Sequence, residues 1–364
     1  MNQHPTQRLQ DAKNADKKNY IFVFTHQLIG SLFERFILLR LLRTISLASW
    51  SLGVGLGCSF LFVVFPVWAD QQGGQRPAAY LGLGAGGMQN AMGGAAVGVR
   101  NDAACGFWNP AGLSGNRGFQ IETQHTFLGL GQELDYLALT TAYREKIFYG
   151  LSTIFYSAGG DLEARKGPTL VPDNTFADIQ MAIFPSVAFR LSPRWSLGAN
   201  LKLFVDNIGS FSGIGFGVDM GVQYRLTKTT TLGFVVLDPY SVLSYSNSND
   251  QIFPLTVKAG IAHHEDKTSV KMNFDLEWSN DLGFRPRAGV EWRPTDILAL
   301  RGGCWAGNLT SGAPGGGLSI NPTGGFGLLV FLGESLIQFD YTLMPDRVES
   351  DGLMHQISVT GKFL

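Results

Sequence analysis

The sequence has little charge and only one long apolar run. Charged residues make up 16% of the 364 residues, below the roughly 25% of ordinary soluble domains. A helix that crosses a membrane needs about 20 apolar residues, and only the segment 44–68 has that length. A helical membrane protein with several spans is therefore excluded, although 45% of the residues are hydrophobic.

The single apolar run has the features of a secretory signal. Arg40 and Arg43 precede it, and small residues around Ala69 end it, so we predict that residues 1–69 are an extension and signal peptide cleaved after Ala69. The run is long for a signal and follows some 40 residues. An uncleaved inner-membrane anchor is therefore the competing interpretation, and a start codon placed too far upstream would explain residues 1–39.

The charge balance after the predicted signal speaks against nucleic-acid binding. Seven of the 28 basic and three of the 29 acidic residues precede Asp70. The remaining 21 basic and 26 acidic residues give residues 70–364 a net charge of about −5, whereas nucleic-acid binding needs a clustered basic excess. We therefore expect no nucleic-acid partner.

The sequence also lacks the patterns of an enzyme or a metal site. It has no Gly-x-Ser-x-Gly motif, and the neighbouring His263 and His264 would point to opposite faces of a strand. Cys105 and Cys304 are more typical of small buried residues than of a disulfide. We predict no catalytic residues, no metal and no cofactor.

From residue 117 onward, apolar and polar residues alternate in segments of about ten. This period of two indicates half-buried strands, as in 194–205, 213–226 and 268–278. A soluble β-sandwich shows the same alternation, but these segments exceed the five or six residues of a usual globular strand. Aromatic residues near the segment ends favour a membrane interface. They are Phe119, Phe127, Tyr143, Tyr156, Trp195, Tyr224, Trp278, Trp292, Trp305 and Tyr341.

We predict an all-β fold, a closed antiparallel transmembrane β-barrel of about 14 strands that spans residues 116–364 and contacts outer-membrane lipid. A sheet that crosses a bilayer must close, because its edges find no water there. Merging or splitting a segment would give 12 or 16 strands. The predicted strands are 117–127, 133–143, 146–157, 177–191, 194–205, 213–226, 229–238, 254–264, 268–278, 285–293, 296–306, 323–332, 335–345 and 354–364.

Short turns between these strands alternate with longer connections. This asymmetry is typical of outer-membrane barrels, which have tight periplasmic turns and long outer loops. Phe363 places an aromatic residue one position before the C-terminus, where such barrels commonly end on the aromatic itself. The predicted long loops are 158–176, 206–212, 239–253, 279–284, 307–322 and 345–352.

The segment 70–115 does not alternate and is rich in glycine and alanine. Small residues allow backbones to approach closely. A flexible linker is the simpler interpretation, but Met92, Phe107 and Trp108 would then be exposed to water. We therefore predict short turns and helices that form a plug inside the barrel.

Residues 108–113, Trp-Asn-Pro-Ala-Gly-Leu, predict a capped turn within this segment. Asn109 must be extended before proline, Asn is a favoured helix N-cap, and Pro110 suits the first helical position. The Asn109 side chain can accept from the N–H of Ala111 or Gly112, and Gly112 can end the turn. Trp108 and Leu113 would anchor it on either side, whereas an ordinary surface turn is the alternative.

The stretch "LGLGAGGMQNAMGGAAVGVRNDAACGFWNPAGL" resembles the N-terminal signature of the PorV/PorQ family, which is related to the long-chain fatty-acid transporter (FadL-like) barrels. "AGVEWRPTDILALRGG" and other later stretches resemble later strands of that family, so that the resemblance covers most of 78–364. It departs at Cys105 and in having one acid after Asn101. The matching plug positions are Met92, Gly93, Gly94, Asp102, Asn109, Pro110, Ala111, Gly112 and Leu113.

The resemblance implies a plugged 14-stranded barrel with two possible functions. In the first, a hydrophobic small molecule lodges in the lumen and is released when the plug shifts, so that the plug residues with Trp108 have a structural or gating role. In the alternative, the barrel is a type IX secretion accessory that binds cargo or a partner protein and has no transport ligand. The sequence identifies no ligand-binding residue for either function.

Overall fold

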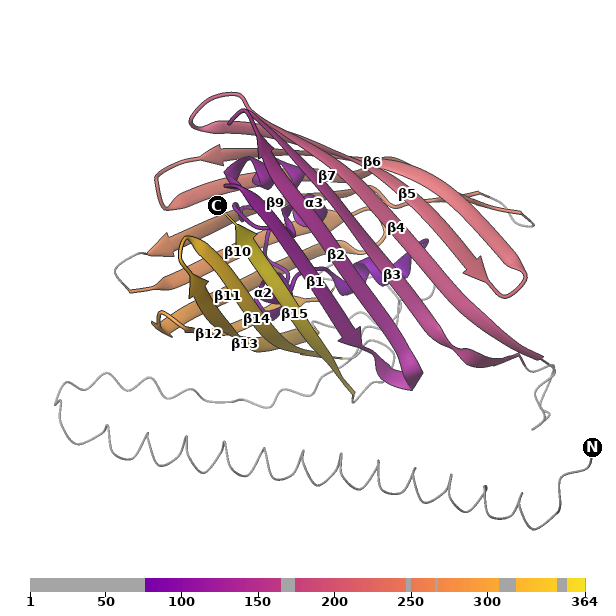
Figure 1. Cartoon of the computed structure of the whole chain (residues 1–364). Coiled ribbons are helices and arrows are strands. Elements are labelled where there is room, and N and C mark those ends of the chain that lie inside the picture. Colours follow the sequence, from indigo (N-terminus) through magenta and orange to yellow (C-terminus); the bar gives the residue numbers. More distant parts are fainter. Residues whose placement is uncertain are drawn as a thin grey trace, which may run out of the picture. The chain divides into compact units, whose positions relative to one another are not determined.

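Fourteen long strands form one antiparallel barrel in the computed structural model (Figure 1). The structure describes residues 76–164, 174–246, 250–265, 268–307, 319–345 and 352–363. Within them, the short strand β8 (Gln251–Ile252) adds to β7. The barrel strands are β1 (Phe119–Phe127), β2 (Gln132–Tyr143), β3 (Ile147–Ala164), β4 (Asn174–Arg190), β5 (Trp195–Ile208), β6 (Phe211–Arg225), β7 (Thr230–Tyr245), β9 (Thr256–Glu265), β10 (Val270–Ser279), β11 (Gly283–Thr295), β12 (Leu298–Ala306), β13 (Ile320–Leu332), β14 (Ser335–Pro345) and β15 (Leu353–Phe363).

The first and last strands close the barrel. β1 pairs with β2 on one side and with β15 on the other, from Phe119 opposite Phe363 to Phe127 opposite His355. The other strands follow chain order, with β7 next to β9. Each of the fourteen strands therefore has a partner on both sides, and the predicted closed barrel of 14 strands is confirmed.

Apolar side chains cover the outside of the barrel, and polar side chains face the lumen. On β5, for example, Leu197 and Leu201 are exposed, whereas Asn200 and Lys202 are buried. A soluble sandwich would bury the apolar face, so this arrangement fits a bilayer around the barrel.

Tyr156 and Trp305 correct the predicted belt of outward aromatic residues, because both face the lumen. The Tyr156 ring stacks on Tyr80 with centroids 5.9 Å apart, and Trp305 is buried beside Arg287.

The two ends of the barrel differ, but less than the sequence predicts. At one end, called the turn end, residues 144–146, 191–194, 226–229, 296–297 and 333–334 connect the strands. At the other, the loop end, several predicted loops are shorter than expected. In the predicted loop 239–253, β7 continues to Tyr245 and β8 occupies 251–252. Residues 209–210 replace the loop 206–212, residues 280–282 replace 279–284, and strands β3 and β4 extend into 158–176. Polar residues such as Asp206 continue the strand because they face the lumen, where the Tyr245 hydroxyl donates to the Asp206 carboxylate.

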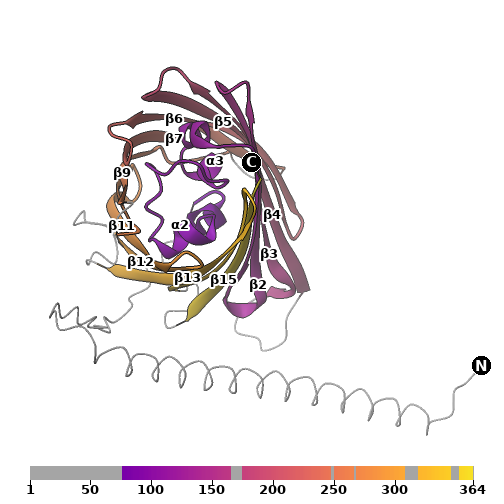
Figure 2. The same cartoon turned by 60° about the vertical axis from the view of Figure 1, so that its left-hand side comes forward.

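Residues 76–116 lie inside the barrel and run from the loop end to the turn end (Figure 2). Arg76 pairs with Asp281 at the loop end, at 2.7 Å, and Ser114 donates to Ser196 at the turn end, at 2.7 Å. The boundary predicted after Ala69 lies outside the described residues, among which no helix is long and apolar enough to span a membrane. The helical elements of this segment are η2 (Ala79–Leu83), α2 (Gly87–Ala91), α3 (Cys105–Trp108) and η3 (Pro110–Gly115), and η4 (Gly129–Gly131) follows β1.

Placing a charge on the outer face tests which side meets lipid. Leu201 lies in the middle of β5 and is exposed, so Leu201→Arg should lower the free energy of unfolding in phospholipid vesicles by about 2–4 kcal/mol. Leu226→Arg, in a turn, is the matched control and should cost roughly 0–1 kcal/mol. Urea titration of the refolded barrels measures both values. Equal costs at the two positions would contradict the outward apolar face.

Candidate functional site: the plug and the two lumen cavities

The wall supplies hydrogen-bond partners to the backbone of the plug. The Asp275 carboxylate on β10 accepts from the backbone N–H of Ala96 at 2.6 Å and of Val97 at 2.9 Å. On β13, the Thr323 hydroxyl accepts from the N–H of Gly93 at 2.9 Å and donates to a plug carbonyl. An unpaired buried backbone group costs about as much as a lost hydrogen bond, so these contacts hold the segment 91–97 against the wall.

Glycine on both sides lets the plug backbone touch the wall backbone. Gly93 packs between β11 and β12, where an added Cβ would lie 2.6 Å from the Cys304 carbonyl oxygen. Its φ of +70° is also in the left-handed region that favours glycine. On the wall, a Cβ on Gly289 or Gly303 would clash with the backbone of Met92. The buried Met92 and the following glycines are therefore brought together with strands that lie far along the chain, at Gly289 and Gly303.

The capped turn forms at residues 109–115. Asn109 is extended, and its side-chain oxygen accepts from the N–H of Ala111 at 3.1 Å, with Pro110 at the first helical position. The Asn109 amide nitrogen also donates to the Val97 carbonyl at 2.9 Å, which ties the turn to the rest of the plug. Gly112 does not end the turn, as the sequence suggested, because η3 continues to Gly115.

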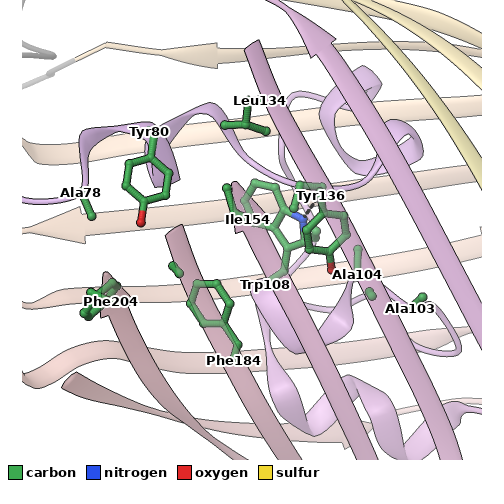
Figure 3. Packing of buried hydrophobic residues seen from close by; sticks show 14 of the residues in the cluster. Ala78, Tyr80, Ala103, Ala104, Trp108, Leu134, Tyr136, Ile154, Phe184 and Phe204 are labelled. Carbon is green, nitrogen blue, oxygen red and sulfur yellow. Dashed lines mark hydrogen bonds between the residues drawn. The ribbon is translucent and has the colours of Figure 1, made fainter. Parts of the chain in front are cut away.

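Trp108 and Leu113 pack in two separate apolar clusters. The Trp108 indole N–H donates to the Ala85 carbonyl at 2.7 Å, and its ring belongs to a buried cluster of plug and wall residues that includes Tyr136 and Ile154 (Figure 3). Leu113 is fully buried with Cys105 and neighbouring wall residues. Burial raises the pKa of the Cys105 thiol. Cys105 and Cys304 are both free and form no disulfide with each other.

Asp102 is a hydrogen-bond centre near the turn end. Its carboxylate accepts from Gln89 Nε2 at 2.6 Å and from the N–H of Ala104 at 3.0 Å. Lys362, near the end of β15, pairs with it at 3.3 Å. Asp102 therefore connects two parts of the plug with the last strand.

Buried ion pairs line the lumen, and the sequence pattern alone does not reveal them. Glu277 pairs with Lys258 at 3.1 Å and Arg287 at 3.0 Å, and Lys202 pairs with Asp219 and Asp238, both at 2.8 Å. The sequence signal for these ion pairs is the charged residues that alternate with apolar ones along β9 to β12. Which charges meet depends on strand register, which the alternation does not determine.

A small cavity lies between the plug and the wall toward the loop end. It measures about 150 Å³. Arg76 and Phe253 border it near the loop end, and the ion pairs of Lys202 and Glu277 form part of its wall. Its apolar lining consists of Pro77, Ala78, Ala79, Leu81, Phe107, Trp108, Phe184, Leu237, Phe253, Pro254, Leu282 and Trp305.

A larger cavity of about 1560 Å³ opens at the turn end. The plug residues 98–102 and the connection 115–118 from the plug to β1 line one side of it, and the strand turns around 144–146 and 190–193 line the other. The plug thus contributes residues to a cavity at each end of the barrel.

Solved structures of channels have the same fold. No protein-family model matches the chain, and no curated protein matches its sequence. The CymD monoaromatic hydrocarbon channel superposes with a TM-score of 0.55 at 17% identity, over 77% of this chain and 98% of that chain. The likeness shows the fold.

Two further structures give the same result. The toluene transporter TodX of Pseudomonas putida has a TM-score of 0.55 at 15% identity, over 76% of this chain and 97% of its own. A FadL homologue of Pseudomonas aeruginosa has a TM-score of 0.52 at 11% identity, with the same two coverages. These likenesses show the fold that the FadL-like resemblance implies, while the PorV/PorQ part stays a prediction.

Adding a side chain at Gly112 tests the packing of the plug. A Cβ there would lie 2.5 Å from the Val99 carbonyl oxygen and 2.8 Å from Cys105 Sγ. Gly112→Val should therefore destabilise the plug by about 1–3 kcal/mol and speed tryptic cleavage at Arg100. Gly302→Val is the control, because an added Cβ meets nothing within 4 Å there. Both barrels should still show a native-versus-boiled gel shift; loss of insertion in Gly112→Val alone would assign the segment to the wall.

Removing the Asp275 carboxylate tests what holds the plug. Asp275→Ala takes away a charged acceptor worth about 1.5–3 kcal/mol, so amide exchange at Ala96 and Val97 should rise roughly 10- to 100-fold. Asp135→Ala is the control, because its carboxylate contacts His125 on the neighbouring strand instead of the plug. Hydrogen-exchange mass spectrometry measures the effect. Unchanged exchange in the Asp275 variant would show that this carboxylate does not hold the plug.

Proposed function

We propose that the chain is an outer-membrane barrel that binds a small hydrophobic compound in the loop-end cavity and releases it when the plug shifts. The observation that carries this proposal is a cavity whose sides are the plug residues Phe107 and Trp108 and the wall residues Phe184 and Phe253. The apolar exterior supports the membrane location. No step of this function needs a catalytic residue or a cofactor.

The size and lining of the cavity favour a single aromatic ring. An apolar cavity of about 150 Å³ holds one benzene-sized molecule, and this one has that volume. Its aromatic side chains offer faces and edges for ring contacts; Phe107, for example, meets Phe184 edge to face with centroids 5.9 Å apart. The CymD and TodX structures are described as a monoaromatic hydrocarbon channel and a toluene transporter, which agrees with a ligand of this class.

The charged groups on the cavity wall are compatible with such a ligand because they form ion pairs with one another. Lys202 bonds to two carboxylates, and Glu277 pairs with Lys258, Arg285 and Arg287. Buried charges that are paired and hydrogen-bonded do not need the ligand as a partner. Arg285 Nε is buried without a partner, but the other paired groups leave the aromatic and aliphatic side chains of the lining available for contact with a ligand.

The competing prediction is a secretion accessory of the PorV/PorQ type, which would bind cargo or a type IX secretion component. It needs no ligand in the lumen. Toluene binding to the purified barrel distinguishes the two functions.

Filling the cavity tests the proposal directly. Ala79 on η2 lines the cavity, so Ala79→Trp should reduce toluene binding at least tenfold by occupying the ring-sized space. Ala177→Trp, at an exposed position of β4, adds the same side chain outside and should bind like the unmodified protein. Headspace gas chromatography against a protein-free detergent blank gives the bound toluene.

Folding of both variants is checked by the native-versus-boiled gel shift. A folded barrel that binds no toluene would reject the transport ligand and favour the secretion accessory. Binding that is unaffected by Ala79→Trp would place the ligand elsewhere in the lumen.

A further inference from the structure

The cavity at the turn end is strongly basic. Ten lysine and arginine side chains line it but only two acidic ones, Asp102 and Glu145. This contrasts with the net negative charge of residues 70–364, so the positive charge is gathered at one place. Some of it is neutralised locally, since Lys271 and Arg293 pair with Glu291 and Lys362 pairs with Asp102.

Three arginines lie near the last turn of the plug, and two of them bond to it. Arg100 Nη2 donates to the Ser114 hydroxyl at 3.0 Å, and Arg190 Nη2 donates to the Ser114 carbonyl. Arg225 Nη2 donates to the Pro193 carbonyl in the adjoining turn. The Arg190 guanidinium also lies over the buried Phe148 ring, 4.8 Å from its centroid. The three side chains come from the plug, β4 and β6, so the fold alone brings them together.

These three guanidinium groups have only neutral hydrogen-bond partners among the described residues. Arg100 Nη1 is buried and has no partner there. Burial and the neighbouring Arg225 and Arg190 groups lower the pKa of Arg100 to about 10. Glu145 is the acidic neighbour of Arg190, and it does not form an ion pair with it. Positive charge thus accumulates where a buried donor still lacks an acceptor.

We propose that Arg100, Arg190 and Arg225 form a binding site for a phosphate-type oxyanion at the turn end of the lumen. A guanidinium group matches phosphate oxygens with two parallel donors, and three such groups suit a doubly charged anion. The same chemistry is offered by free phosphate and by a phospholipid headgroup. This site is separate from the apolar loop-end cavity and does not depend on a hydrophobic ligand there.

Binding of inorganic phosphate to the purified full barrel tests the site. Equilibrium dialysis with labelled phosphate at constant ionic strength should show one saturable site. Arg100→Gln and Arg190→Gln should each weaken binding at least tenfold. The matched control is Arg194→Gln, because Arg194 is exposed, lies outside the cavity lining and contacts Tyr224.

A second arm identifies the source of the anion. The barrel is extracted from vesicles with equal phosphatidylglycerol and phosphatidylcholine, and mass spectrometry measures which lipid stays bound. Preferential retention of phosphatidylglycerol that is lost in Arg100→Gln assigns the site to a lipid headgroup. Saturable phosphate binding without such retention assigns it to a free anion.

The native-versus-boiled gel shift checks that each variant is folded. Arg100→Lys keeps the positive charge but not the two parallel donors, so it should retain part of the phosphate binding. Arg225→Gln gives an independent variant from another strand should Arg190→Gln fail to fold. The proposal is overturned if neither phosphate nor phosphatidylglycerol binds to the folded barrel. It is equally overturned if Arg100→Gln and the available strand variant bind as tightly as Arg194→Gln.

Discussion

The plug can lie in the lumen only because its backbone groups find partners on the wall. Val97 shows this most clearly, since its N–H donates to Asp275 and its carbonyl accepts from Asn109 and Gln223. The short helices of the plug satisfy few of their own donors and acceptors, so the wall must provide the others. Glycines such as Gly289 remove the side chains that would otherwise keep the two backbones apart.

The same constraint explains the polar interior of the barrel. The irregular backbone of the plug needs polar side chains on the wall as hydrogen-bond partners. Where the plug does not reach these side chains, they pair with one another. Ion pairs such as Arg301 with Glu291 and Asp340, at 2.7 and 2.6 Å, therefore lie beside plug contacts on the same wall. On the outside of the barrel the side chains are apolar. Each strand therefore alternates between an apolar outward residue and a polar inward one.

The plug divides the lumen into two chemically different cavities. Trp108 borders the apolar cavity toward the loop end, and Arg100 borders the basic cavity at the turn end. Both belong to the one segment that is tied together through Asn109 and Val97. A displacement of this segment would therefore change both cavities at once, as the proposed release of a ligand requires.

The sequence by itself determined the barrel and the capped turn, because alternation and capping depend on residues close together in the chain; the alternation leaves the strand number between 12 and 16. Leu197 and Leu201 mark an outer face by spacing alone, and Asn109 with Pro110 marks the turn. Tyr156 and Trp305 show the limit of such local patterns. An aromatic residue near a strand end can point to the lumen as well as outward, and these two point to the lumen. Only the tertiary structure decided the ion pairs, the apolar cavity and the arginine cluster. Their members lie on different strands and the plug, and it is register and the path of the plug that bring them within contact.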